Sequence, residues 1–208
     1  VGVDHILWSD MIKRVAESSF NAITVDGDTS TNDTFLAFSS GPKLDPRYLS
    51  TLEEGLHLIA QYLAKAIARD GEGANCLLEV KVEGSQSDSD ARLIARTISS
   101  SSLVKTAVHG SDPNWGRIIA ALGRAGISYN LKDVQLWIGP YKIFSSGIPL
   151  DFDRQKVSNF MKARFKGKYL IDDIVSIRLR VGMGEGLATA WGCDLSDKYV
   201  RINADYTT

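Results

Sequence analysis

The sequence lacks several features that would point to a function directly. Only two of its 208 residues are cysteine, Cys76 and Cys193, and both lie in apolar, strand-like segments without CxxC spacing. Two isolated thiols of this kind indicate neither a disulfide framework nor a zinc site, so we expect buried free thiols. No run of 18 apolar residues occurs, which leaves no candidate for a membrane-spanning helix. The beginning of the chain also lacks the order of a secretory signal, and we expect a cytoplasmic protein.

An excess of positive charge is missing as well. Lys and Arg number 24 against 25 Asp and Glu, which gives a formal net charge of −1 at pH 7. The most basic stretch, Lys162 to Lys168, follows a helical pattern and is interpreted as a solvated helix end. Because nucleic-acid binding depends on clustered positive charge, we expect no nucleic-acid partner.

Motifs that hold cofactors or metals are absent too. The segment GMGEG, Gly182 to Gly186, contains G-x-G without the rest of a dinucleotide fingerprint, and no P-loop motif occurs. The polar run Asp26 to Asp33 imitates the first positions of a calcium loop. It carries Thr31 where the loop needs glycine and Ala37 where the loop needs a bidentate glutamate. We therefore predict neither a cofactor nor a bound metal.

The residues that are present favour an α+β fold. Hydrophobic residues make up 44% of the chain, which is enough for a sizeable core. Helices are predicted over 4–20, 46–68, 88–101, 117–125 and 153–165, and strands over 21–25, 34–40, 76–84, 134–139, 141–147 and 174–181, with a strand or turn over 103–108. Strands and helices mix without repeated βαβ units, so a layered αββα arrangement is favoured over a doubly wound sheet. We expect one unit over residues 1–208, with 127–150 as the place where it could be subdivided.

Two of the predicted helices carry specific local signals. Asp4 is suited to cap the first helix. The helix over 46–68 has a stripe of large apolar residues, the kind of face that normally packs on a core. Its members are Leu49, Leu52, Leu56, Leu58, Ile59, Tyr62 and Leu63.

Polar segments between the apolar ones are the candidates for function. The run Asp26 to Thr34 is either a turn whose side chains bond their own backbone or a rigid support beside an active site. HGSDPNWGR, residues 109–117, could hold an anion at a helix start, although Asp112 could simply cap that helix with Pro113 at its first position. His109 alone is a weak candidate for a general base, because no nucleophile motif accompanies it. DGEG and GMGEG each place one glutamate between glycines, where a ligand could approach the backbone.

Taken together, these segments resemble a known family. The stretches SFNAITVDGDTSTNDT (19–34), ARDGEGA (68–74), SSLVKTAVHGSDPNWGRI (101–118) and ATAWGCDLSDKYVRINADYTT (188–208) resemble the β chain of the ornithine acetyltransferases, also called bifunctional glutamate N-acetyltransferases. The four matches run in order over nearly the whole chain. The resemblance implies a fold of the self-cleaving N-terminal-nucleophile type, an αββα-like sandwich with a smaller C-terminal α/β portion.

The same resemblance implies a reaction and partners. Acetyl moves from N-acetylornithine to glutamate in arginine biosynthesis, and in some members also from acetyl-CoA to glutamate; the sequence leaves this second donor open. A precursor cleaves itself before a threonine, whose hydroxyl becomes the nucleophile with its own amine as base. An α chain from the same precursor supplies the oxyanion hole, and the two chains form an α2β2 heterotetramer. No metal or prosthetic group is implied.

The resemblance also implies site residues. Glu72 of DGEG falls at the family's substrate-binding glutamate, and Asn203 and Thr208 of INADYTT fall at the C-terminal substrate-binding positions. Glu79 is the competing glutamate. Asp26, Asp28, Asn32 and Asp33 are expected to support the site rather than to react.

One departure from the family pattern concerns the nucleophile. A β chain of this family should begin with threonine and a short apolar strand, whereas this sequence begins VGVDHILW. No catalytic residue can therefore be named in it. Two other readings remain: a non-catalytic ligand-binding or assembly domain of the same fold, and an aminopeptidase with similar self-cleaving architecture.

Overall fold

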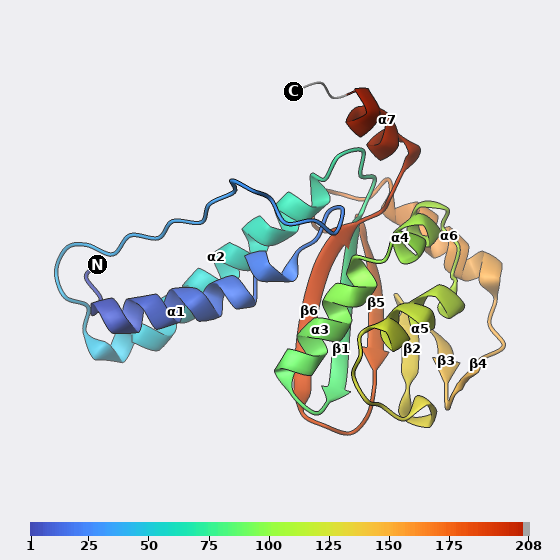
Figure 1. Ribbon diagram of the computed structural model, residues 1–208, viewed down its shortest axis with the longest axis horizontal. Coiled ribbons are helices and arrows are strands. Elements are labelled where there is room, and N and C mark those ends of the chain that lie inside the picture. Colours follow the sequence, from blue (N-terminus) through green and yellow to red (C-terminus); the bar gives the residue numbers. More distant parts are fainter. Residues whose placement is uncertain (206–208) are drawn as a thin grey trace.

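The computed structural model describes residues 1–205 and is built around one six-stranded sheet (Figure 1). The strand order is β4-β3-β2-β5-β1-β6. β1 and β5 run parallel, and every other neighbouring pair is antiparallel. The strands are β1 (Leu77–Ser85), β2 (Gln135–Ile138), β3 (Tyr141–Ser145), β4 (Ile148–Pro149), β5 (Ile174–Arg180) and β6 (Gly186–Cys193). The mixed sheet and its helices confirm the α+β prediction.

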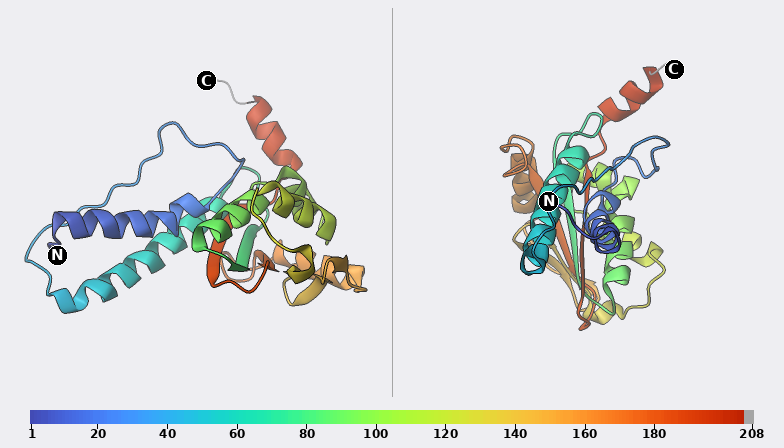
Figure 2. Two further views of the ribbon diagram at one scale, coloured as in Figure 1. Left: turned by 60° about the horizontal axis from the view of Figure 1, so that its bottom comes forward. Right: turned by 90° about the vertical axis from the view of Figure 1, so that its left-hand side faces the viewer.

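Helices cover both faces of this sheet (Figure 2). One face carries α3 (Asp88–Ser99), α4 (Ser102–His109) and α5 (Trp115–Arg124), and the other carries α2 (Leu49–Arg69) and α6 (Arg154–Arg164). Alternation along β1 separates the two layers: Leu78 and Val80 pack with the α3 side, whereas Leu77 packs with Ala64 and Ala68 of α2. Within residues 1–205 the chain thus contributes a single sheet to the predicted layered arrangement.

The segment 127–150 extends the same sheet. β2 pairs with β5 and β3 pairs with β2, so both strands continue the sheet formed around β1. A subdivision of the chain at this segment stays a prediction.

Three predicted elements are wrong. Residues 20–22 form a short 3-10 helix, η1 (Phe20–Ala22), followed by one bridge between Ile23 and Trp191 instead of a strand over 21–25. Residues 34–40 have no regular structure and run along α1 (His5–Glu17), where Trp8 Nε1 donates to the carbonyl oxygen of Ala37 at 3.3 Å. A strand needs a neighbouring strand for its backbone groups, and within the described residues 34–40 has none. The strand or turn over 103–108 is helix α4.

The long helix was predicted correctly, but four of the seven residues of its apolar stripe face outward. η2 (Pro46–Tyr48) leads into α2, whose buried residues are Ala60, Ala64 and Ala68. These small side chains let the helix approach the sheet closely. The large residues Leu58, Ile59, Tyr62 and Leu63 are 46–65% exposed.

Other local predictions are confirmed. Asp4 caps α1, accepting a hydrogen bond from the Ile6 backbone at 3.0 Å. Cys76 and Cys193 are buried free thiols.

Among residues 1–205, no helix combines the length and apolar content needed to cross a bilayer. η3 (Leu131–Asp133) precedes β2, and α7 (Asp197–Asp205) projects from the end of the sheet where β6 finishes (Figure 1).

Candidate functional site

Glu72 and Asn203 meet at the end of the sheet where β1 begins and β6 finishes. Glu72 lies in the loop between α2 and β1, and Asn203 lies on α7. The Asn203 side-chain amide donates to the Glu72 carboxylate and also to the carbonyl oxygen of Tyr199, at 3.0 Å. Both side chains are exposed. Two of the three predicted substrate-binding residues are therefore in contact, while the third, Thr208, lies outside the described residues.

Gly73 joins the loop to the start of α7. Its φ angle is +70°, and an added Cβ would lie 2.8 Å from Lys198 Cβ, Ser196 Oγ and the Tyr199 backbone nitrogen. Only glycine combines this conformation with this close approach. The Ser196 hydroxyl donates to the Gly73 carbonyl oxygen at 2.7 Å. The position of α7 relative to Glu72 is thus fixed by direct contact.

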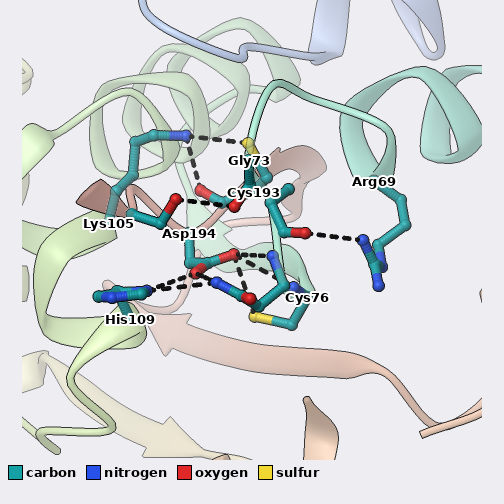
Figure 3. Close-up of polar contacts among 10 residues, drawn as sticks. Arg69, Gly73, Cys76, Lys105, His109, Cys193 and Asp194 are labelled. Carbon is teal, nitrogen blue, oxygen red and sulfur yellow. Dashed lines mark hydrogen bonds and ion pairs between the residues drawn. The ribbon is translucent and has the colours of Figure 1, made fainter. Parts of the chain in front are cut away.

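Beneath this loop, the buried carboxylate of Asp194 is surrounded by polar groups of Asn75, Cys76 and His109 (Figure 3). Its Oδ1 accepts from the backbone nitrogens of Asn75 at 2.7 Å and Cys76 at 3.1 Å. Its Oδ2 accepts from Asn75 Nδ2 at 2.7 Å and lies 2.9 Å from His109 Nδ1. The side chain has no solvent exposure, so these donors replace its water. His109 therefore contributes to the scaffold of the loop.

Two further charged side chains fix the flanks of the loop (Figure 3). Lys105 is buried, and its Nζ donates to the Cys193 carbonyl oxygen at 2.6 Å. Arg69, the last residue of α2, pairs with the buried carboxylate of Asp173. These contacts tie the end of β6 to α4 and the end of α2 to the residue before β5.

Neither buried thiol has the properties of a nucleophile. Burial raises the pKa of Cys76, and the negative charge of Asp194 raises it further. Burial also raises the pKa of Cys193, against the opposing effect of Lys105. Both thiols are protonated at neutral pH, whereas thiol nucleophiles react as thiolates.

The polar run Asp26 to Thr34 contacts the site where Asp26 meets Tyr199 of α7. The Tyr199 hydroxyl donates to Asp26 at 3.4 Å. Burial raises the pKa of Tyr199, and the Asp26 charge raises it further, which keeps the hydroxyl protonated as a donor. Elsewhere the run makes local turn contacts: Asp28 donates its backbone N–H to Asp26, and Asp33 donates its own to Ser30.

The competing glutamate has a different environment. Glu79 lies on β1 and accepts a hydrogen bond from Trp191 Nε1 at 2.9 Å. Lys65 Nζ lies 3.7 Å from the same carboxylate. Its charge is thus compensated beneath α2, and the contact from Asn203 goes to Glu72.

The remaining polar motifs serve local structure. Asn114, rather than Asp112, caps α5, accepting from the Arg117 backbone at 3.1 Å, while Asp112 pairs with Arg154. In GMGEG, an added Cβ on Gly184 would lie 2.0 Å from the Ser85 carbonyl oxygen, so this glycine allows β1 and the turn before β6 to touch. The turn stands at the opposite end of β1 from Glu72, and the two glycine-flanked glutamates do not meet.

Sequence reasoning missed three residues that build the site. Asp194, Ser196 and Tyr199 follow directly on the apolar strand β6. Polar residues at the end of a buried strand were the available signal. No group of three or more His, Cys, Asp or Glu side chains in residues 1–205 could hold a metal ion.

Comparison with known proteins gives consistent matches. The ArgJ family model matches residues 1–208. A protein of Prochlorococcus marinus strain NATL2A, named arginine biosynthesis bifunctional protein ArgJ, is 85% identical over all of this chain and 50% of its own length. The protein of the same name from strain MIT 9313 is 62% identical over all of this chain and 49% of its own. This chain thus spans about half the length of the curated relatives it matches.

A solved structure agrees. The crystal structure of arginine biosynthesis bifunctional protein argJ from Bacillus halodurans superposes with a TM-score of 0.90 at 39% identity, covering 99% of this chain and 96% of that one.

Proposed function

The chain belongs to the ArgJ family, and on that premise we propose that it is the β chain of a glutamate N-acetyltransferase that acts in arginine biosynthesis. The reaction moves an acetyl group from N-acetylornithine to glutamate through an acetyl-threonine intermediate. The observation that carries the proposal is the contact of Asn203 with Glu72, which joins the two positions where the family resemblance expects substrate to bind.

In this reaction the chain holds the amino-acid part of the substrate. The Glu72 carboxylate is suited to pair with the ammonium group of ornithine, because a charge-assisted hydrogen bond is among the stronger polar contacts. Asn203 orients that carboxylate from α7, and its amide oxygen is a second acceptor for the same ammonium group. Ser196 and Gly73 keep α7 beside Glu72. Thr208 would complete the contact with the substrate's polar end.

The acetyl transfer itself would run through an N-terminal threonine and an oxyanion hole. A threonine at the start of the mature β chain attacks the acetyl carbonyl while its amine accepts the hydroxyl proton; the C–N bond to ornithine breaks and ornithine leaves with that proton. The amine of glutamate then attacks the threonine ester, which forms N-acetylglutamate and restores the threonine hydroxyl. Donors from an α chain stabilise the oxyanion of each tetrahedral intermediate. The length of the relatives, about twice that of this chain, supports an α chain cut from the same precursor. We propose an α2β2 assembly in the cytoplasm.

The test is an acetyl-transfer assay on the full-length protein. N-acetylornithine and labelled glutamate should yield labelled N-acetylglutamate, and mass spectrometry after incubation with N-acetylornithine alone should find an acetyl group on an N-terminal threonine. Absence of both products would overturn the proposal. A protein that binds N-acetylornithine without becoming acetylated is instead a non-catalytic binding domain. Replacing N-acetylornithine with acetyl-CoA determines whether the enzyme is bifunctional, as the names of its relatives state.

A further inference from the structure

The outer face of α2 has the composition of a buried surface. The outer face of α2 is defined as the exposed side chains of Leu58, Ile59, Tyr62, Leu63 and Ile67. They recur at intervals of three and four residues and so form one continuous side of the helix. Single exposed apolar residues are ordinary on protein surfaces, but a contiguous patch marks a contact with another molecule.

Three of the four Asp, Glu, Lys and Arg residues of α2 contact neighbours within this chain, and the fourth, Glu54, is exposed near the start of the helix. Glu53 pairs with Arg14 of α1, Lys65 lies beside Glu79 of β1, and Arg69 pairs with Asp173 before β5. From Leu58 onward the helix thus directs its charges toward neighbours in this chain and its large apolar side chains away from them, which reverses the usual arrangement of a surface helix.

The apolar surface continues onto a second segment. The Tyr169 hydroxyl donates to the carbonyl oxygen of Ala66 at 3.4 Å, so the segment after α6 lies against the outer side of α2. Tyr169 and Ile171 are themselves 50% and 70% exposed. Large apolar area with few charges is typical of a permanent interface rather than a transient one.

We propose that the outer face of α2 is the docking surface for the other half of the precursor, the α chain. The inference rests on the proposed function, since it takes the chain to be one of two parts of that precursor. The curated relatives carry about as many residues outside this chain as within it. A partner made in the same polypeptide covers the face at a high effective concentration from synthesis onward, whereas a second copy does so only by intermolecular assembly.

The first experiment is hydroxyl-radical footprinting of the assembled, unmodified full-length protein. Leu58 is compared with Leu103 of α4, a leucine of similar exposure on the opposite face of the sheet. The proposal expects Leu58 to be oxidised several-fold less than Leu103. Equal oxidation of the two leucines overturns it. Because no substitution is involved, this measurement does not depend on the folding of a variant.

The second experiment identifies the occupant. The double variant Leu58→Gln, Leu63→Gln and the control Leu103→Gln are made in the full-length protein with an affinity tag on the other half. The proposal expects urea to release this chain from the tagged half at a lower concentration in the double variant than in the control. Equal release overturns it. It is also overturned if light scattering shows the assembly falling to half its mass with both halves still together, because a second copy then occupies the face.

An acetyl-transfer assay on the same preparations separates the two proposals. Protection of Leu58 without acetyl transfer leaves the docking surface standing and removes the proposed function. Acetyl transfer with Leu58 unprotected supports the proposed function and removes the docking surface.

Discussion

Asn203 donates a hydrogen bond to the carboxylate of Glu72 across 131 residues of sequence. The contact joins the loop before β1 to α7. Neither residue is rigid by itself, since both side chains are exposed. Their relative position is set by the bonds beneath them, from Ser196 to Gly73 and from Asn75 and Cys76 to Asp194. An exposed carboxylate held by a buried scaffold is an arrangement suited to binding a small cationic group.

Replacing Glu72 tests its role in substrate binding. In Glu72→Gln the charge is lost while the shape is kept, and the substrate ammonium loses a charge-assisted hydrogen bond. Such a bond contributes about 1.5–3 kcal/mol, so kcat/KM for N-acetylornithine should fall by roughly 10- to 100-fold. Steady-state kinetics of the full-length protein measure the effect.

Two glutamates provide the controls for this substitution. Glu185→Gln lies at the far end of β1 and should leave kcat/KM unchanged. Glu79→Gln should lower stability through its contacts with Trp191 and Lys65 and leave substrate binding intact. If Glu79→Gln rather than Glu72→Gln lowers kcat/KM, the assignment of the substrate ligand is wrong.

Gly73 offers a test of how α7 is held. In Gly73→Ala the new methyl group meets Lys198, Ser196 and Tyr199 at 2.8 Å, and the left-handed conformation is strained as well. Gly126→Ala is the matched control, since its φ of +72° is similar and nothing lies within 4 Å of an added Cβ. Strain alone costs about 1–2 kcal/mol, and overpacking adds about 1–3 kcal/mol.

The two glycine variants should also differ in function. Gly73→Ala should displace α7 and raise the KM for N-acetylornithine, while Gly126→Ala should lower only the thermal midpoint. An unchanged KM in Gly73→Ala, with the thermal loss equal to that of Gly126→Ala, would show that α7 is not held by this contact.

Asp194 is expected to dominate the stability of the loop. Asp194→Ala leaves the backbone nitrogens of Asn75 and Cys76 without their buried acceptor. Losing a buried carboxylate that accepts several hydrogen bonds costs about 3 kcal/mol or more of unfolding free energy. Asp172→Ala, at an exposed carboxylate, should change it by less than about 0.5 kcal/mol. Urea unfolding of both variants measures the difference, and equal midpoints would contradict the role given to Asp194.

The parts of the fold that depend on nearby residues were predictable. Asp4 caps α1 because its carboxylate reaches backbone groups two and three residues away, and the turn bonds of Asp26 are equally local. The irregular structure of residues 34–40 was not predictable, because these residues suit a strand but a strand forms only beside another. Periodicity revealed the apolar side of α2 but not which side of the helix packs on the sheet. The close approach of Ala60, Ala64 and Ala68 decides which side faces the sheet.

The candidate site likewise contains residues that could be predicted from the sequence and residues that could not. Glu72 and Asn203 were predicted from the family resemblance, and no spacing rule joins positions so far apart. Asp194 was missed because an aspartate after a strand usually faces solvent. Its burial depends on donors from the loop before β1 and from α4, which only the folded chain brings together.

The two buried thiols predict a specific loss of stability at alkaline pH. Burial raises the pKa of Cys76 and Cys193 above their ordinary value of 9.0 in the folded protein. The unfolded chain therefore releases these protons at lower pH than the folded one, so their stabilising contribution is present below about pH 9 and is lost as the pH rises further. Each thiol adds up to about 1.4 kcal/mol per pH unit to the slope. Urea midpoints from pH 7 to 10 should fall more steeply in wild type than in Cys76→Ala, Cys193→Ala, whose cavities lower stability equally at every pH. Parallel curves would mean that the thiols ionise as readily in the folded protein as in the unfolded one.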